Sequence, residues 1–135
     1  MLIGEKLGHS LSAPIHGLLF EKMGWPGAYR LQEIPKDRVD QVGDAMRLLG
    51  IRGMNVTIPY KLDIIPQMDE VDDLARRVGA VNTVLNQNGR LTGYNTDVYG
   101  LMAMLAYHGL SPKGKPCAVL GSGGAARCAA VALRA

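Results

Sequence analysis

The sequence predicts an α/β protein, because segments with the apolar spacing of strands and of helices alternate almost to the end of its 135 residues. Glycine and proline separate most of these segments. The composition, 47% hydrophobic and 20% charged, is that of an ordinary globular protein. A chain of this length buries roughly two-thirds of its surface on folding, so a core of useful size can form.

The first fifty residues are predicted to form a strand, a helix, a second strand and a second helix. The strands are a short apolar run at residues 1–4 and an alternating segment at residues 28–34. Ser12 is expected to cap the first helix, which stops at Gly24, and Asp37 is expected to cap the second. The apolar stripes are Ile15, Leu18, Leu19 and Met23 in the first helix and Val39, Val42, Met46 and Leu49 in the second.

The next sixty residues are predicted to hold three strands and two helices. A strong hairpin signal lies at Asn88-Gly89, since both residues tolerate a positive φ between two strand-like runs. The last helix is expected to turn Leu101, Met104 and Leu105 inward. In order, the segments are a strand at 53–58, a helix at 71–78, strands at 80–86 and 90–94, and a helix at 97–108.

The C-terminal part begins with a linker-like segment at residues 111–116, rich in proline, glycine and lysine. A buried strand at Cys117–Leu120 and an alanine-rich helix from Ala125 to Ala135 are expected to follow. A parallel strand–helix–strand unit needs a second strand to bury the helix, so the chain is expected to end within a domain. The predicted division is residues 1–110 and residues 111–135.

Charge and cysteine content exclude several classes of protein. The net charge of +3 comes from scattered residues, without the clustered basic and aromatic residues of a nucleic-acid site. No stretch is long enough to span a membrane and no secretory signal is visible, so a cytoplasmic protein is expected. Cys117 and Cys128 stand in segments expected to be buried, as free thiols, and no metal-binding spacing occurs.

A glycine-rich turn at Gly121-Ser122-Gly123-Gly124-Ala125 follows the last expected strand and opens the last helix. Small residues there let the backbone approach a pyrophosphate, and the helix N-terminus offers free N–H groups to that anion. Ala126 stands where the common fingerprint has its third glycine, which is a tolerated variant. The alternative is a tight strand–helix turn that binds no ligand.

Polar side chains recur at the ends of the expected strands. Asn55 and Thr57 alternate with apolar residues, so one face of their strand is polar and should meet a cleft or solvent. Lys61 follows at the carboxyl end, where ligands bind in open α/β sheets, although a surface lysine is the ordinary alternative. Asn82 repeats the pattern, and Asp97 stands at a helix start, where it would also serve as a cap.

Five short motifs together resemble those of the shikimate dehydrogenases and their quinate-using relatives. They extend over essentially the whole chain, in the family's order and approximate spacing. The motifs are His9-Ser10-Leu11-Ser12, Asn55-Val56-Thr57-Ile58-Pro59-Tyr60-Lys61, Ala80-Val81-Asn82-Thr83, Asn95-Thr96-Asp97 and Gly121-Ser122-Gly123-Gly124-Ala125.

The resemblance implies a substrate-binding domain built as a three-layer α/β sandwich with a mostly parallel sheet, followed by the first strand–helix unit of a Rossmann domain. It implies reversible reduction of 3-dehydroshikimate by NADPH, in the pathway to chorismate and aromatic amino acids. No nucleic acid or membrane partner is expected, and the protein would be a monomer or a homodimer.

The resemblance also implies a role for each matching residue. Lys61 and Asp97 would form the catalytic pair. The substrate carboxylate would be held by Ser10 and Ser12, and its hydroxyls by Asn55, Thr57, Asn82 and Asp97. The pyrophosphate of NADP would lie on Gly121, Ser122, Gly123, Gly124 and Ala125, and Asp73 matches an acidic position sometimes linked to that cofactor.

The chain departs from the family pattern at a few positions. Ala13 stands between the second serine and the proline that usually follows it, and Val98-Tyr99 replace small residues after Asp97. Most of the nucleotide domain is expected to be missing, including the loop that separates NADP from NAD. A non-catalytic domain that binds shikimate or quinate and a quinate-preferring dehydrogenase therefore stay open as alternatives.

Overall fold

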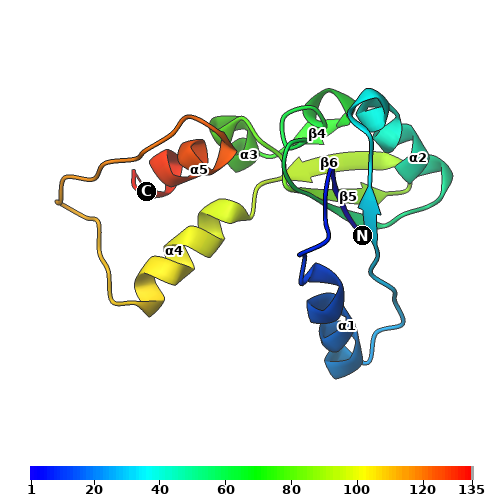
Figure 1. Cartoon of the computed structure of the whole chain (residues 1–135), viewed down its shortest axis with the longest axis horizontal. Coiled ribbons are helices and arrows are strands. Elements are labelled where there is room, and N and C mark those ends of the chain that lie inside the picture. Colours follow the sequence, from blue (N-terminus) through cyan, green and yellow to red (C-terminus); the bar gives the residue numbers. More distant parts are fainter. Residues whose placement is uncertain (135) are drawn as a thin grey trace.

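The computed structural model describes residues 1–134 as a six-stranded sheet flanked by helices (Figure 1), which confirms the predicted α/β class. No helix among these residues is both long and apolar enough to cross a bilayer. The strands are β1 Leu2–Gly4, β2 Leu31–Glu33, β3 Gly53–Val56, β4 Glu70–Val71, β5 Thr83–Gln87 and β6 Arg90–Tyr94. The helices are α1 Ser12–Met23, α2 Val42–Leu48, α3 Asp73–Val78, α4 Asp97–Tyr107 and α5 Gly124–Ala132, with 3-10 turns at Lys36–Gln41 and Ile65–Gln67.

The strand order across the sheet is β2-β1-β3-β5-β6-β4. The three pairings β2–β1, β1–β3 and β6–β4 are parallel, whereas β3–β5 and β5–β6 are antiparallel. The sheet is therefore mixed, because the β5–β6 hairpin lies in its interior. Asn88 (φ 55°) and Gly89 (φ 89°) form the turn of that hairpin, as the sequence predicts.

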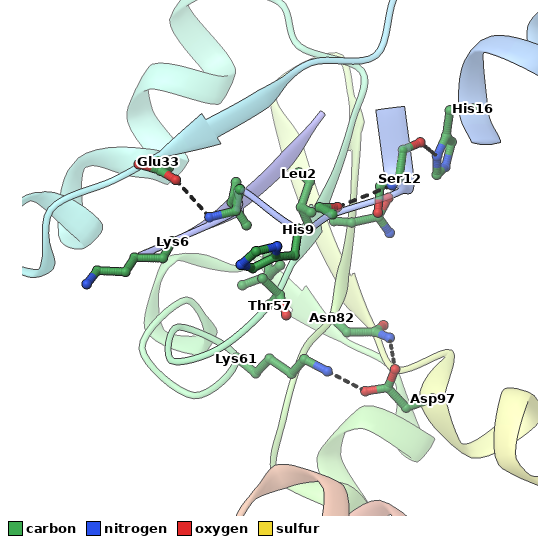
Figure 2. Close-up of a pocket in the computed structure, with 15 residues that line it drawn as sticks. Leu2, Lys6, His9, Ser12, His16, Glu33, Thr57, Lys61, Asn82 and Asp97 are labelled. Atoms are coloured by element: carbon green, nitrogen blue, oxygen red, sulfur yellow. Dashed lines mark hydrogen bonds and ion pairs between the residues drawn. The ribbon is translucent and has the colours of Figure 1, made fainter. Parts of the chain in front are cut away.

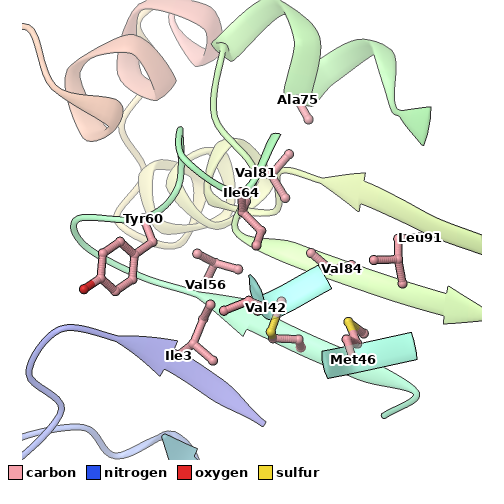
Figure 3. Close-up of a cluster of buried hydrophobic side chains, with 11 residues drawn as sticks. Ile3, Val42, Met46, Val56, Tyr60, Ile64, Ala75, Val81, Val84 and Leu91 are labelled. Carbon is pink, nitrogen blue, oxygen red and sulfur yellow. The ribbon is translucent and has the colours of Figure 1, made fainter. Parts of the chain in front are cut away.

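The main core lies on one face of the sheet, under α2 and the segment that follows β3 (Figure 3). Residues of alternating strand positions supply the sheet side of this core, and the fully buried Tyr60 and Ile64 cover it. A second, smaller cluster joins α3, α4 and α5. It consists of Val78, Ala80, Val98, Cys128 and Ala132, with Leu74, Leu101 and Val131 packed against it.

Most expected elements form within a few residues of their predicted bounds. The helices at 12–23 and 73–78 both end at glycines in the left-handed conformation, Gly24 (φ 61°) and Gly79 (φ 69°). Strand β4 was not expected, because two residues carry no periodic signal. The last expected helix begins at Gly124 and ends at Ala132, and its expected end at Ala135 lies outside the described residues.

Four expectations from the sequence are wrong. Asp37 lies inside a 3-10 turn and does not cap α2, which begins after Gln41. Residues 117–120, Cys117 included, are exposed and unpaired among the described residues, because a strand forms only where a neighbouring strand supplies hydrogen bonds. Met104 is 52% exposed, on the outer side of α4. Leu11, not Ser12, occupies the N-cap position of α1.

Candidate active site

A cavity of about 870 Å³ opens beside the carboxyl ends of β1 and β3 (Figure 2). Its lining comes from β1 and the loop after it, the start of α1, the end of β2, strand β3 and the turn after it, the residue before β5 and the start of α4. All the side chains that the sequence suggests for substrate binding lie in that lining, and they are Ser10, Ser12, Asn55, Thr57, Lys61, Asn82 and Asp97.

An ion pair between Lys61 and Asp97 forms the centre of the site. The ammonium Nζ lies 2.6 Å from the carboxylate Oδ2, across 36 positions of sequence. Asp97 is the first residue of α4, where the helix N-terminus favours a negative charge. The two side chains are 21% and 38% exposed, so a small molecule in the cavity can reach both.

Asn82 holds the other oxygen of that carboxylate. Its Nδ2 donates to Asp97 Oδ1 at 2.8 Å and to Thr96 Oγ1 at 2.9 Å, while its Oδ1 accepts the backbone N–H of Thr96 at 2.9 Å. The side chain is buried, and these bonds fix the rotamer of Asp97. The carboxylate therefore faces Lys61 with one oxygen and a neutral amide with the other.

Asn55 is held from two sides on the far wall of the cavity. Its Oδ1 accepts a hydrogen bond of 2.7 Å from the Tyr29 hydroxyl, and its Nδ2 donates to Thr83 Oγ1 at 3.1 Å. The ring of His16 stacks on Tyr29 with centroids 3.8 Å apart. Burial raises the pKa of the Tyr29 hydroxyl, and a hydrogen bond with Ser12 opposes that rise. Tyr29 thus supports the cavity wall as a neutral donor.

Ser10 and Ser12 lie at the N-terminal end of α1. Ser10 Oγ accepts the backbone N–H of Ser12 at 3.2 Å, so Ser10 satisfies one of the free N–H groups at the start of α1. The loop that carries them is fixed by Glu33, whose Oε1 accepts the N–H of Leu7 at 2.8 Å. Both serines therefore line the same cavity, Ser10 from the anchored loop and Ser12 from the first turn of α1.

Thr57 lies where the β3 segment passes the end of β1. A Cβ added to Gly4 would stand 2.7 Å from Thr57 Cγ2, so glycine is required for this close approach. The backbone N–H of Thr57 donates to the Ile3 carbonyl at 2.9 Å, which continues the parallel pairing past the end of the strand. Thr57 is thereby fixed in the cavity lining.

Several residues of the lining were not singled out by the sequence. Lys6, His9, His16 and Glu33 add further polar and charged groups to the cavity. His9 belonged to a motif, whereas the other three are isolated polar residues without a local pattern. Only their three-dimensional placement brings them to the site.

The residues suggested for the cofactor lie elsewhere. Gly121 has φ 116°, which an L side chain rarely adopts, and Gly123 is extended before α5. Gly123 and Gly124 have open space where a Cβ would stand, so a pyrophosphate can approach the helix N-terminus. Asp73 stands in the first turn of α3, 98% exposed and 4.0 Å from Arg76. Neither Asp73 nor the glycine-rich turn lines the cavity.

Comparison with known proteins identifies relatives over nearly the full chain. A shikimate dehydrogenase (NADP(+)) from Alkaliphilus metalliredigens is 43% identical over 132 residues, which cover 98% of this chain and 46% of that protein. The crystal structure of shikimate dehydrogenase 1 from Peptoclostridium difficile matches with a TM-score of 0.95 and 42% identity, over 98% of this chain and 49% of that one.

A further match is shikimate 5-dehydrogenase from Thermus thermophilus in complex with NADP(H) and shikimate, with a TM-score of 0.91 and 40% identity. It covers 98% of this chain and 50% of that one. The chain thus spans about half the length of the relatives it matches. A family model described as the shikimate dehydrogenase substrate binding domain matches residues 2–84. The chain therefore belongs to the shikimate dehydrogenase family and carries that family's substrate-binding domain.

Proposed function

We propose that this chain supplies the substrate site and catalytic pair of an NADP-dependent shikimate dehydrogenase. The reaction is the reversible reduction of 3-dehydroshikimate to shikimate, on the route to chorismate and aromatic amino acids. The observation that carries the proposal is the contact of 2.6 Å between Lys61 and Asp97 inside the cavity that also holds the other suggested substrate residues.

The geometry fits the proton transfer that this reaction needs. Hydride addition to a ketone leaves a developing alkoxide, which requires a proton donor within hydrogen-bond reach. The Lys61 ammonium can donate that proton and stabilise the developing negative charge. Asp97 holds the ammonium toward the cavity and, through its hydrogen bond with Asn82, keeps a single orientation.

The substrate would be held by groups that match its chemistry. Ser10 and Ser12 line the cavity, where their hydroxyls would donate to the carboxylate. Asn55, Thr57, Asn82 and Asp97 would bind the ring hydroxyls. Every one of these residues is already held by a backbone or side-chain contact. Binding would therefore cost little side-chain conformational entropy.

NADPH would supply the hydride. Its pyrophosphate would lie on residues Gly121–Ala125, at the N-terminus of α5, and Asp73 would contribute from α3. We assign residues 1–110 to the substrate domain and residues 111–135 to the start of the nucleotide domain, with the linker before α5 as the boundary.

The test is shikimate-dependent reduction of NADP⁺ by this chain joined to the C-terminal half of the Alkaliphilus relative. We expect Lys61→Ala to lower kcat about 100-fold or more, with a smaller change in KM, because the lysine acts mainly in the transition state. Lys113→Ala, in the exposed linker, is the matched control and should keep wild-type rates.

Calorimetry with shikimate and with quinate on the 135-residue chain separates the alternatives. Binding of shikimate without turnover in the joined protein would indicate a binding domain, and a preference for quinate in both measurements would indicate a quinate dehydrogenase. Wild-type kcat in Lys61→Ala would refute the role given to that lysine.

A further inference from the structure

A continuous chain of side-chain hydrogen bonds runs beside the cavity from the segment before β2 to the proposed catalytic pair. Its links are Tyr29 to Asn55 (2.7 Å), Asn55 to Thr83 (3.1 Å) and Thr83 to Asn82 (3.0 Å). Asn82 then contacts Asp97 (2.8 Å), which pairs with Lys61 (2.6 Å). Thr83 is the third of these six residues, and it does not line the cavity.

The directions of the hydrogen bonds from Tyr29 to Asn82 follow from one backbone group. The N–H of Thr96 can only donate, so the Asn82 atom that it meets at 2.9 Å is the carbonyl oxygen Oδ1. That oxygen also lies 3.0 Å from Thr83 Oγ1, and an amide oxygen can only accept. The Thr83 hydroxyl hydrogen therefore points to Asn82 Oδ1, which lies closer to Thr83 Oγ1 (3.0 Å) than to the other hydroxyl beside it, Thr96 Oγ1 (3.2 Å).

The same reasoning extends to Asn55. With its hydrogen used on Asn82, Thr83 Oγ1 can only accept from Asn55, so the Asn55 atom that faces it is Nδ2. Oδ1 then faces the Tyr29 hydroxyl, which must donate. A tyrosine hydroxyl can donate or accept, so Tyr29 alone would not distinguish the two ends of the amide. Thr83 makes that distinction.

We propose that Thr83 is a positioning residue that fixes which end of the Asn55 amide faces each neighbour and couples that amide to Asn82 and the catalytic pair. Asn55 and Thr83 lie directly opposite each other where β3 pairs with β5, so the contact is held by the sheet register. The proposal rests on the function proposed above as far as the ligand is concerned. The hydrogen-bond direction does not depend on it.

Thr83→Val is the decisive substitution. Valine keeps the shape of threonine and suits a strand, but it can neither donate to Asn82 nor accept from Asn55. Either end of the amide could then meet Tyr29. Because Thr96 still holds Asn82, the loss should appear at Asn55 and in substrate affinity. Thr83→Ser keeps the hydroxyl, and Thr92→Val on the neighbouring strand β6 is a matched control outside the cavity lining.

Two measurements on the 135-residue chain test the proposal. In ¹⁵N NMR spectra, Thr83→Val should shift the side-chain amide signals of Asn55 and remove their protection from hydrogen exchange, while those of Asn82 persist. In calorimetry with shikimate, Kd should rise about tenfold, the loss of one well-formed hydrogen bond. Thr83→Ser should stay within about threefold of wild type, and Thr92→Val should be unchanged.

The outcomes separate the two proposals. Unchanged Asn55 amide signals in Thr83→Val would overturn the positioning role, and so would a serine variant as impaired as the valine variant. A wild-type chain that does not bind shikimate would overturn the proposed function, while the NMR comparison would still decide the role of Thr83. Thermal unfolding of each variant confirms that the compared chains are folded.

Discussion

Cys128 is buried in the second cluster, within reach of the charges of Asp97 and Lys61, whereas Cys117 is exposed in the segment before α5. Burial raises the pKa of the Cys128 thiol, Asp97 raises it further, and Lys61 partly opposes this. The thiolate is the reactive form, so the two cysteines should differ strongly in reactivity.

We expect one thiol per chain to react rapidly with Ellman's reagent at about pH 8 and the other at least about tenfold more slowly. Unfolding in urea should make both react fast. Cys117→Ser should remove the rapid phase and leave the slow one. Equal rates for both thiols in the folded chain would contradict the burial of Cys128.

For individual residues, the sequence motifs predicted which side chains lie together at the cavity but not which contacts orient them. Asn82 and Asp97 stand in short motifs and indeed line one cavity with Lys61. Tyr29 and His16 carry no local signal in the sequence. Their rings stack between α1 and the segment before β2, and the Tyr29 hydroxyl reaches Asn55 in β3 across 26 positions of sequence. Spacing along a chain reports helix faces and strand faces, and such contacts between elements lie outside it.

The last turn of helix α2 is linked to the sheet by polar contacts of Arg47. Arg47 donates to Asp69 Oδ2 at 2.9 Å and to the carbonyl oxygens of Gln67 and Gly89. The same Asp69 oxygen accepts the N–H of Leu91 at 2.7 Å, so one carboxylate joins α2 to β6. The Leu91 N–H, and then Arg47, hold the pKa of Asp69 below its usual value.

A lowered pKa in the folded state means that Asp69 stabilises the fold above its unfolded pKa of about 3.9 and loses this effect as the pH falls through its folded value. We therefore expect Asp69→Asn to lower the free energy of unfolding at pH 7. The difference from wild type should shrink as the pH falls below about 4. Urea unfolding followed by circular dichroism measures both.

Asp73→Asn is the control, because that side chain is 98% exposed and should contribute little at any pH. A difference between wild type and Asp69→Asn that stays constant from pH 7 to about pH 3 would show that the charge of Asp69 does not stabilise the attachment of α2.

Elements with strong local signals were predicted well, and elements defined by neighbours were not. Asn88-Gly89 determines its own turn geometry, so the β5–β6 hairpin follows directly from the sequence. Strand β4 has only two residues and exists because β6 lies beside it. Residues 117–120 have an apolar composition typical of a strand, but no strand of the described chain pairs with them.

The molecule as a whole has two unequal packed regions. The sheet and its main core form one, and the second cluster holds α5 against α3 and α4 (Figure 1). The segment between α4 and α5 is almost entirely exposed, and within it the Lys115 N–H donates to the Pro112 carbonyl in a single turn. Exposed backbone with few hydrogen bonds unfolds locally at a low cost in free energy.

We expect trypsin to cut first between Lys113 and Gly114, at least about tenfold faster than at any site within the sheet, because exposed loop tips are preferred cleavage sites. Lys115 precedes Pro116 and should resist. Mass spectrometry should show fragments 1–113 and 114–135. Lys113→Gln should slow this cut. An earlier cleavage within residues 53–94 would contradict the inference that the segment between α4 and α5 opens more easily than the sheet.

The position of the hairpin in the interior of the sheet has a consequence for how the protein folds. The β5–β6 pair is a local contact that can form early, whereas β1–β3 and β3–β5 join distant parts of the chain and require long loops to close first. Asn55 and Thr83 meet only after β3 has docked on β5. We therefore expect the cavity beside β3 to be among the last features to assemble, and its occupancy by a small ligand would serve as a kinetic probe for completion of the native sheet.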